Sequence, residues 1–236
     1  MKKKELIKKL FTFDAAYKQM NAAYDKKDAL LAIGFYFLVM LMYMCAGIAE
    51  VTWGISLNVY VNLISIVVCI TVVIVCKQKL KTVGFTANRF VRALIVGIIW
   101  GIAVPMINVI PAIASGGKWM GLDRLLWKVF FYLVVIALQE ELVFRGFILT
   151  RLHGIIKSEA IIAIVCGLMF AMMHVPYQLF IRTGGNIAEF FLNNSFWLAT
   201  TFTWHFMFYG LYRKYNSLTA PVICHFLINF SNTLFG

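Results

Sequence analysis

The amino-acid sequence predicts an all-α protein, a polytopic bundle of about seven transmembrane helices. Three observations predict this fold class: 62% of the 236 residues are hydrophobic, only 14% are charged, and the mean hydropathy is +0.83. Soluble domains are about 45–50% apolar and about 25% charged, and a folded surface is already more than half apolar. A water-soluble protein of this length could not bury so many apolar side chains. The composition therefore excludes a soluble enzyme, a disordered chain and a secreted disulfide scaffold.

Seven apolar stretches are long enough, or nearly so, to cross a hydrocarbon core of about 30 Å, which takes about 20 helical residues. They cover residues 29–49, 52–76, 91–114, 125–150, 160–181, 187–210 and 218–236. The first is too long and begins too late for a cleaved signal peptide. Pro105 and Pro111 should kink the third stretch. The five cysteines lack CxxC spacing and are interpreted as small buried residues.

The basic residues predict the orientation of these stretches. Residues 1–28 hold eight lysines, and the loop around 77–92 holds five Lys or Arg. The loops on the opposite side hold only Lys118, Arg124 and Arg182. Basic loops stay in the cytoplasm, so we expect a cytoplasmic N-terminus and a C-terminus outside. Residues 1–28 would form a basic juxtamembrane segment, and residues 29–236 the transmembrane domain.

The first 13 residues have an amphipathic pattern, in which Leu6, Ile7, Leu10 and Phe11 share a helical face among lysines. Such a segment should lie at the membrane interface and favour anionic lipid. A frayed basic tail fits the same residues equally well. Nucleic acid is not an expected partner, because no basic platform interleaved with aromatic residues is present.

The fourth stretch contains Glu140, Glu141 and Arg145, where lipid should surround the chain. A charged side chain at the bilayer centre costs at least about 2.5–3.5 kcal/mol, so such residues usually have a function. Glu141 and Arg145 are four residues apart, with the acid before the base, which favours an ion pair. Glu140 points about 100° away from Glu141. We therefore interpret Glu141 and Arg145 as a structural pair and Glu140 as a candidate general base.

The fifth and seventh stretches add His174, His225 and Asn229. Glu140 lies 17 residues before Lys157, near the cytoplasmic turn, and His174 lies 17 residues after it. Both side chains should therefore lie about 25 Å from that turn, at about 1.5 Å per residue. The same reasoning places His225 and Asn229 about 15 and 21 Å from the preceding turn. A base that activates water and donors that stabilise an oxyanion are what amide hydrolysis requires.

Each residue taken singly also has a structural interpretation. A lone His in a membrane helix is most often an interhelical hydrogen-bond partner. We interpret His205 in this way, whereas His153 lies in a cytoplasmic loop where water can solvate it. Asn229 alone would be read as a helix–helix contact. The aromatic residues are assigned to lipid contact or packing, including Phe130, Phe131, Trp197 and Trp204.

The sequence resembles the CPBP intramembrane proteases in three ordered motifs, which are Glu140-Glu141-x-x-x-Arg145, Phe170-x-x-x-His174 and His225-x-x-x-Asn229. This family, also called Abi, includes CAAX prenyl endopeptidases and bacteriocin-processing or self-immunity proteins. The resemblance covers about residues 125–236, which would form the protease core. Residues 1–124 match no motif that we can name.

The resemblance implies an intramembrane endopeptidase that hydrolyses a peptide bond of a membrane-associated protein or peptide, of CAAX type or of leader and bacteriocin type. In that family pattern Glu140, helped by His174, activates a water molecule. His225 and Asn229 hold the oxyanion. The supporting motif residues would be Glu141, Arg145 and Phe170. The resemblance also implies a multi-pass protein of a bacterial plasma membrane.

No cofactor is expected for this chemistry. The alternative is Zn²⁺, which Glu140, His174 and His225 could ligate. The HExxH helix of zinc proteases is absent, however, and adjacent glutamates do not reproduce its spacing. We therefore favour a metal-independent glutamate protease. The GxSG and GxGD signatures of other intramembrane proteases are absent as well.

Two other classes of function compete with the protease. A non-catalytic membrane protein of the same family could act as an immunity or regulatory-interaction factor. A transporter could use the buried Glu and His residues as a proton relay. The transporter ranks third, because the sequence lacks paired interrupted spans in two matching halves.

Overall fold

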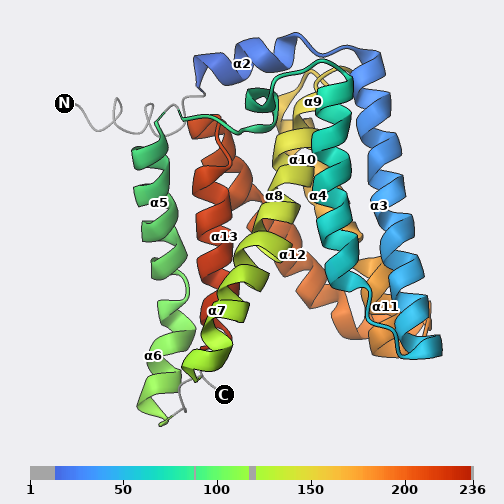
Figure 1. Ribbon diagram of the computed structural model, residues 1–236, viewed down its shortest axis with the longest axis vertical. Helices are drawn as coiled ribbons and strands as arrows, with labels where there is room; N and C mark the ends of the chain where they lie inside the picture. Colours follow the sequence, from blue (N-terminus) through green and yellow to red (C-terminus); the bar gives the residue numbers. More distant parts are fainter. Residues whose placement is uncertain (1–13, 88, 117–120, 235–236) are drawn as a thin grey trace.

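The computed structural model describes residues 14–87, 89–116 and 121–234, and its regular elements there are all helical (Figure 1). The long helices run roughly side by side, while α2 (Ala15–Ala22) lies across one end of the bundle (Figure 1). The predicted all-α fold is confirmed for these residues. The amphipathic segment predicted over residues 1–13 lies outside them.

The first half of the bundle begins with two helices joined by a short loop, α3 (Lys26–Trp53) and α4 (Asn58–Val75). Asp25 starts α3 by accepting hydrogen bonds from the first turn, in a capping box with Asp28. Gly54 ends α3 with φ +68°, a left-handed conformation that glycine adopts without steric cost. The single-turn helix η1 (Leu80–Val83) follows α4.

The third predicted stretch forms two helices, α5 (Phe90–Ala103) and α6 (Met106–Ala114). The break between them falls at Pro105, as predicted, because proline lacks the N–H that a continuous helix needs there. Pro111 instead lies inside α6, which continues to Ala114. The structure therefore bears out the first of the two proline predictions and shows no helix end at the second.

The fourth predicted stretch is the central rod of the molecule and has an irregular helical path. The segment α7 (Leu122–Phe130) leads into η2 (Phe131–Leu138), α8 (Gln139–Glu141), η3 (Leu142–Leu149) and α9 (Thr150–Leu152). The two η segments here are π-helical, a conformation that occurs mostly at functional sites. Every residue of η3 is buried. At Gly146, a Cβ atom would lie 2.6 Å from the carbonyl oxygen of Val83, so only glycine lets η1 pack this closely.

The second half of the bundle surrounds this rod. The elements are α10 (Glu159–Met173), α11 (Val175–Thr183), α12 (Ile187–Tyr215) and α13 (Thr219–Ser231). His174 separates α10 from α11, because Pro176 in the first turn of α11 interrupts the preceding hydrogen-bond ladder. Helix α13 packs along α5 and also contacts α12 and η2, whereas α11 packs against α3.

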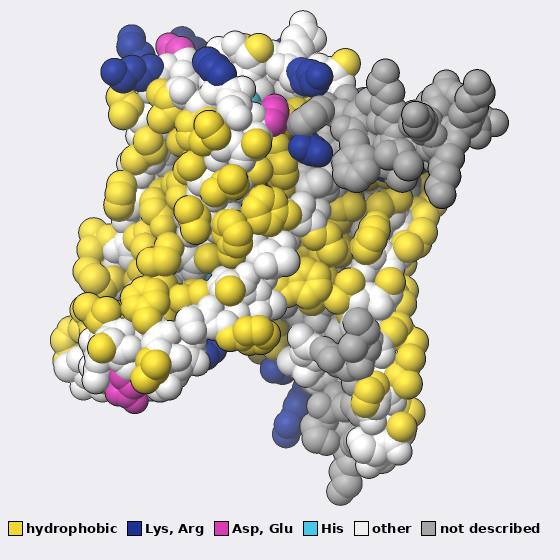
Figure 2. Space-filling model, turned by 180° about the vertical axis from the view of Figure 1, so that it is seen from behind, with side chains coloured by type: hydrophobic (Ala, Val, Ile, Leu, Met, Phe, Trp, Pro, Cys, Tyr) yellow, Lys and Arg dark blue, Asp and Glu magenta, His cyan; other side chains and the backbone are white. Residues whose placement is uncertain are grey.

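Three helical segments of the described residues are long and apolar enough to cross a membrane, which are Lys26–Trp53, Asn58–Val75 and Glu159–Thr183. Two shorter apolar helices are Phe90–Ala103 and Thr219–Ser231. Figure 2 shows hydrophobic side chains covering the middle of one face, with Lys and Arg toward its two ends. These features are those of an integral membrane protein. Seven spans and the direction of insertion stay predictions.

Candidate active site

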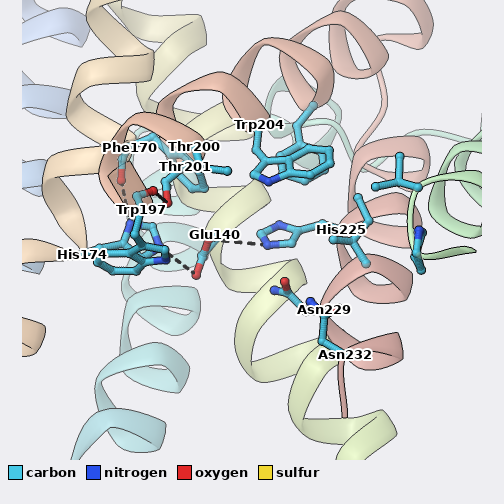
Figure 3. A pocket seen from close by; sticks show the side chains of 14 residues that line it. Glu140, Phe170, His174, Trp197, Thr200, Thr201, Trp204, His225, Asn229 and Asn232 are labelled. Carbon is cyan, nitrogen blue, oxygen red and sulfur yellow. Dashed lines mark hydrogen bonds and ion pairs between the residues drawn. The ribbon is translucent and has the colours of Figure 1, made fainter. Parts of the chain in front are cut away.

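Glu140 lies in the middle of the central rod, and its carboxylate is flanked by two imidazoles (Figure 3). Its Oε1 atom is 3.8 Å from Nε2 of His174, and its Oε2 atom is 3.8 Å from Nε2 of His225. Glu140 is only 8% exposed. The three residues come from α8, the α10–α11 junction and α13. The structure thus brings together the residues that helix lengths place at similar depth.

Hydrogen bonds at the far side of each ring fix the orientation of both imidazoles. Nδ1 of His174 lies 2.9 Å from the carbonyl oxygen of Phe170, which can only accept, so Nδ1–H donates. Nδ1 of His225 lies 2.9 Å from Oε1 of Glu141, a carboxylate that also accepts. Each ring therefore presents Nε2 to Glu140. Such a partner on the second nitrogen is what orients functional histidines.

Glu141 and Arg145 form the buried ion pair that the sequence predicts. Oε1 of Glu141 accepts a hydrogen bond of 3.1 Å from Nη1 of Arg145, and both side chains are fully buried. The same Oε1 accepts the hydrogen bond from His225. The Arg145 guanidinium lies 4.1 Å from the ring centroid of Phe170 and 5.2 Å from that of Phe208. The pair therefore anchors His225 through a carboxylate and Phe170 through its ring.

The predicted site residues share a cavity of about 510 Å³, which is lined by Glu140, Phe170, His174, His225 and Asn229 among others. Figure 3 shows the Asn229 amide turned toward the space beside Glu140 and His225. A cavity of this volume is large enough for a segment of peptide. Glu141 and Arg145 lie behind the wall of the cavity and do not line it.

One wall of the cavity was missed by sequence reasoning. Trp197, Thr200, Thr201 and Trp204 of α12 line it, and the edge of Trp197 meets the His174 ring at a centroid distance of 5.5 Å. Trp197 and Trp204, which the sequence assigns to lipid contact or packing, do pack against buried hydrophobic residues, and they also line this cavity. Their spacing of i, i+3, i+4 and i+7 marks one helix face. The two threonines on that face are the feature of the sequence from which this cavity wall could have been predicted.

The two remaining histidines lie outside the cavity. His205 is fully buried, and its ring stacks on that of Tyr209. His153 is only 6% exposed and hydrogen-bonds the Leu149 carbonyl and the Glu159 carboxylate. The expectation that water solvates His153 is therefore wrong, because neighbouring side chains cover this turn. Neither histidine is available to the candidate active site.

The alternative zinc site can be tested against the arrangement of its three candidate ligands. A metal ion needs donor atoms that converge on one point at about 2 Å. Here the Glu140 carboxylate lies between the two imidazoles, and each Nε2 faces a different oxygen (Figure 3). Across residues 14–87, 89–116 and 121–234, no group of three or more His, Cys, Asp or Glu residues is arranged to hold a metal ion. The metal-independent site and its zinc alternative both stay predictions.

Comparison with known proteins gives one match. Residues 122–231 match the family model described as type II CAAX prenyl endopeptidase Rce1-like. The matched range contains Glu140, His174, His225 and Asn229, together with the whole central rod from α7 to α9. No curated protein and no solved structure matches the chain significantly.

Proposed function

Because residues 122–231 belong to the Rce1-like family of CAAX prenyl endopeptidases, we propose that this protein is an intramembrane peptidase that uses Glu140 as its general base. One observation carries the proposal: a nearly buried carboxylate stands 3.8 Å from each of two oriented Nε2 atoms, beside a peptide-sized cavity. A carboxylate without a direct ion pair can accept a proton from water. Glu141 next to it is ion-paired with Arg145 and does not line the cavity, so it cannot take that role.

The first step is the attack of water on the scissile carbonyl carbon. A separation of 3.8 Å is too long for a direct hydrogen bond, but one water molecule can contact both Glu140 and His174. Glu140 takes one proton of this water while the oxygen forms the new bond to carbon. The neutral His174 ring accepts a hydrogen bond at Nε2 and so helps to orient the same water. The carbonyl π electrons move onto oxygen and form a tetrahedral oxyanion.

His225 and Asn229 are the proposed donors to that oxyanion. The Asn229 amide donates through its NH₂ group. Nδ1 of His225 donates to Glu141, so Nε2 can donate only when the ring is doubly protonated. The Glu141 carboxylate stabilises that imidazolium. When the tetrahedral intermediate collapses, the C–N bond breaks and Glu140 returns its proton to the leaving amine, giving a carboxylic acid and an amine.

The substrate is proposed to be a membrane-associated peptide or protein of CAAX type. The aromatic and threonine wall of α12 supports this, because Trp and Thr side chains combine apolar contact with hydrogen-bonding groups along an extended peptide. A lipid-linked or membrane-anchored segment would reach the cavity from the bilayer without crossing water. The name of the matching family supports a prenylated C-terminus as the first substrate to test.

The test is cleavage of a fluorogenic farnesylated CAAX peptide by the protein reconstituted in liposomes. Glu140→Gln keeps the shape of the side chain and removes the base, so kcat should fall by about 10²–10⁴-fold. Gln19→Glu, at an exposed position of α2 that does not line the 510 Å³ cavity, is the control for a Gln/Glu exchange. Full turnover by Glu140→Gln would refute the proposal. An unprenylated leader peptide, assayed in parallel, separates the two substrate types.

The absence of a metal requirement is part of the same proposal. We expect the active protein to keep its turnover after dialysis against a chelator, and to hold much less than one zinc per chain. Loss of turnover that added Zn²⁺ restores would favour the alternative set of ligands, Glu140, His174 and His225. The measurement is metal content by mass spectrometry on the same preparation that is assayed.

A further inference from the structure

A second, smaller cavity of about 140 Å³ reaches Glu140 from the other side of the central rod. Its walls come from α3, α4 and α11, whereas the larger cavity is walled by α12, α13 and the α5–α6 break. Glu140 and His174, which would activate water, line both cavities, whereas His225 and Asn229, which would hold the oxyanion, line only the larger one. This division matches the proposed roles.

Seven of the nine residues that line the second cavity carry a polar group, although the bundle around it is apolar. Besides Glu140 and His174, its lining includes Tyr43, Asn58, Asn62, Tyr177 and Gln178, and its apolar members are Ile136 and Met173. A buried polar group without a hydrogen-bond partner costs several kcal/mol in hydrocarbon. Empty cavities in proteins are apolar, whereas polar cavities of sufficient size hold water. At about 30 Å³ per molecule, this volume holds roughly four waters.

The polar residues of the second cavity include partly exposed and buried ones. Asn58, in the first turn of α4, is partly exposed, and Gln178 of α11 is partly exposed as well. One turn further along α4, Asn62 is only 5% exposed and accepts a hydrogen bond from the Tyr43 hydroxyl. Glu140 and His174 line the same cavity. Its polar residues therefore extend from partly exposed positions to the candidate base.

Hydrogen bonds between helices fix the positions of these polar side chains. The Tyr177 hydroxyl donates a 2.5 Å hydrogen bond to the Glu50 carboxylate, which ties α11 to α3 at the outer end. The Tyr43 hydroxyl donates to Asn62, which ties α3 to α4 further in. Beside Glu140, the fully buried amide of Gln139 interacts with the Tyr43 hydroxyl and lines neither cavity.

We propose that the second cavity is a water channel that supplies the hydrolytic water to Glu140 and His174, with Asn62 as a positioning residue. The inference rests on the proposed peptidase function. Substrate would occupy the larger cavity and exclude water from it. The attacking water would instead reach Glu140 through the second cavity, which α3 and α4 line. These two helices lie outside the matched range 122–231, so the proposal gives the first half of the chain a part in the reaction.

The first experiment measures steady-state cleavage by Asn62→Leu. Leucine has a similar size and no polar group, so kcat should fall by about tenfold or more while KM stays within about twofold, because water activation contributes about 10²–10⁴-fold. Asn62→Ser keeps a hydroxyl in the channel, so its kcat should fall less than that of Asn62→Leu. Asn21→Leu is the matched control, since Asn21 is a buried asparagine of α2 outside both cavities. Wild-type kcat in Asn62→Leu would overturn the proposal.

The second experiment detects the water without relying on turnover. Hydroxyl radicals generated from bound water by a synchrotron pulse oxidise side chains that touch that water. Tyr43 is 8% exposed and should be oxidised faster than Tyr212, which is fully buried away from both cavities. Asn62→Leu should slow the oxidation of Tyr43 to the rate of Tyr212. Equal, slow rates in the wild-type protein would overturn the proposal even if Glu140→Gln shows that the peptidase function is right.

Discussion

Replacing Glu141 by Gln should destabilise the protein more than replacing Arg145 by Met, and the double substitution should cost less than the sum of the two single losses. Both side chains are fully buried, and removing one partner of such a pair costs about 3–5 kcal/mol, because the other charge stays buried. After Arg145→Met, Glu141 keeps the hydrogen bond from His225. After Glu141→Gln, Arg145 loses its ion pair and keeps the faces of Phe170 and Phe208 and the electrostatic attraction of Glu140.

We therefore place Arg145→Met near the lower end of that range and Glu141→Gln near the upper end, a change of about 10²- to 10⁴-fold in the unfolding equilibrium. In the double variant no charge stays unpaired, and the Gln carbonyl can still accept from His225. The coupling energy of the double-mutant cycle should then be about 2–3 kcal/mol. Its measurement is reversible unfolding of all four proteins in bicelles by steric trapping.

The matched control is the ion pair between Arg89 and Asp14, whose Arg89 side chain is 46% exposed. Arg89→Met should cost less than Arg145→Met, since the Arg89 side chain is half exposed and the nearly buried Asp14 carboxylate keeps the hydrogen bond from the Ala16 backbone N–H. Additive losses for Glu141→Gln and Arg145→Met, with a coupling energy under about 0.5 kcal/mol, would refute the reasoning. A smaller loss for Glu141→Gln than for Arg145→Met would refute the part assigned to His225.

Two further predictions concern helix packing and pH. Gly97→Ala should lower the free energy of unfolding by about 1–3 kcal/mol, because its Cβ would lie 2.8 Å from the Ala220 carbonyl oxygen and push α5 away from α13. The control is Gly34→Ala, which has open space around its Cβ and should be neutral or stabilising. Equal effects of the two substitutions in thermal unfolding would contradict this prediction. Hydrogen bonds from the backbone N–H groups of Asp28 and Lys27 lower the pKa of the exposed Asp25 carboxyl. A lowered folded-state pKa gives stability that is present above the ordinary pKa and lost as pH falls through the folded value. The stability difference between wild type and Asp25→Asn should therefore shrink below about pH 4, and a constant difference in acid unfolding curves would contradict it.

The core of the candidate site could be predicted from sequence because it depends on helix length and spacing alone. Glu140 and His174 are equally far from one turn, so any antiparallel hairpin brings them to similar depth. Glu141 and Arg145 pair within one helix, where spacing i and i+4 decides the contact. The capping residue Asp25 and the break at Pro105 are local as well. These features need no knowledge of how distant helices pack.

The features that were missed depend on contacts between segments far apart in sequence. The π-helical segments on both sides of α8 leave no mark in the hydrophobic pattern. His153 lies in a turn that reads as solvated, but the ring of Tyr17 from α2 covers it at a centroid distance of 5.9 Å. Asn62 lies in an otherwise apolar stretch, and its place near Glu140 follows only from the packing of α4 against α8. Tertiary packing decides all of these.

The bond between Tyr177 and Glu50 bears on how such proteins can diversify. Tyr177 lies within the segment that the family model matches, and Glu50 lies in the half that it does not. The close approach of Val83 to Gly146 crosses the same boundary. A chimaera that joins residues 122–231 to an unrelated first half would inherit the carboxylate and imidazoles but lose these contacts. The two halves are therefore expected to evolve as one unit, with substitutions on either side of the boundary compensating for each other.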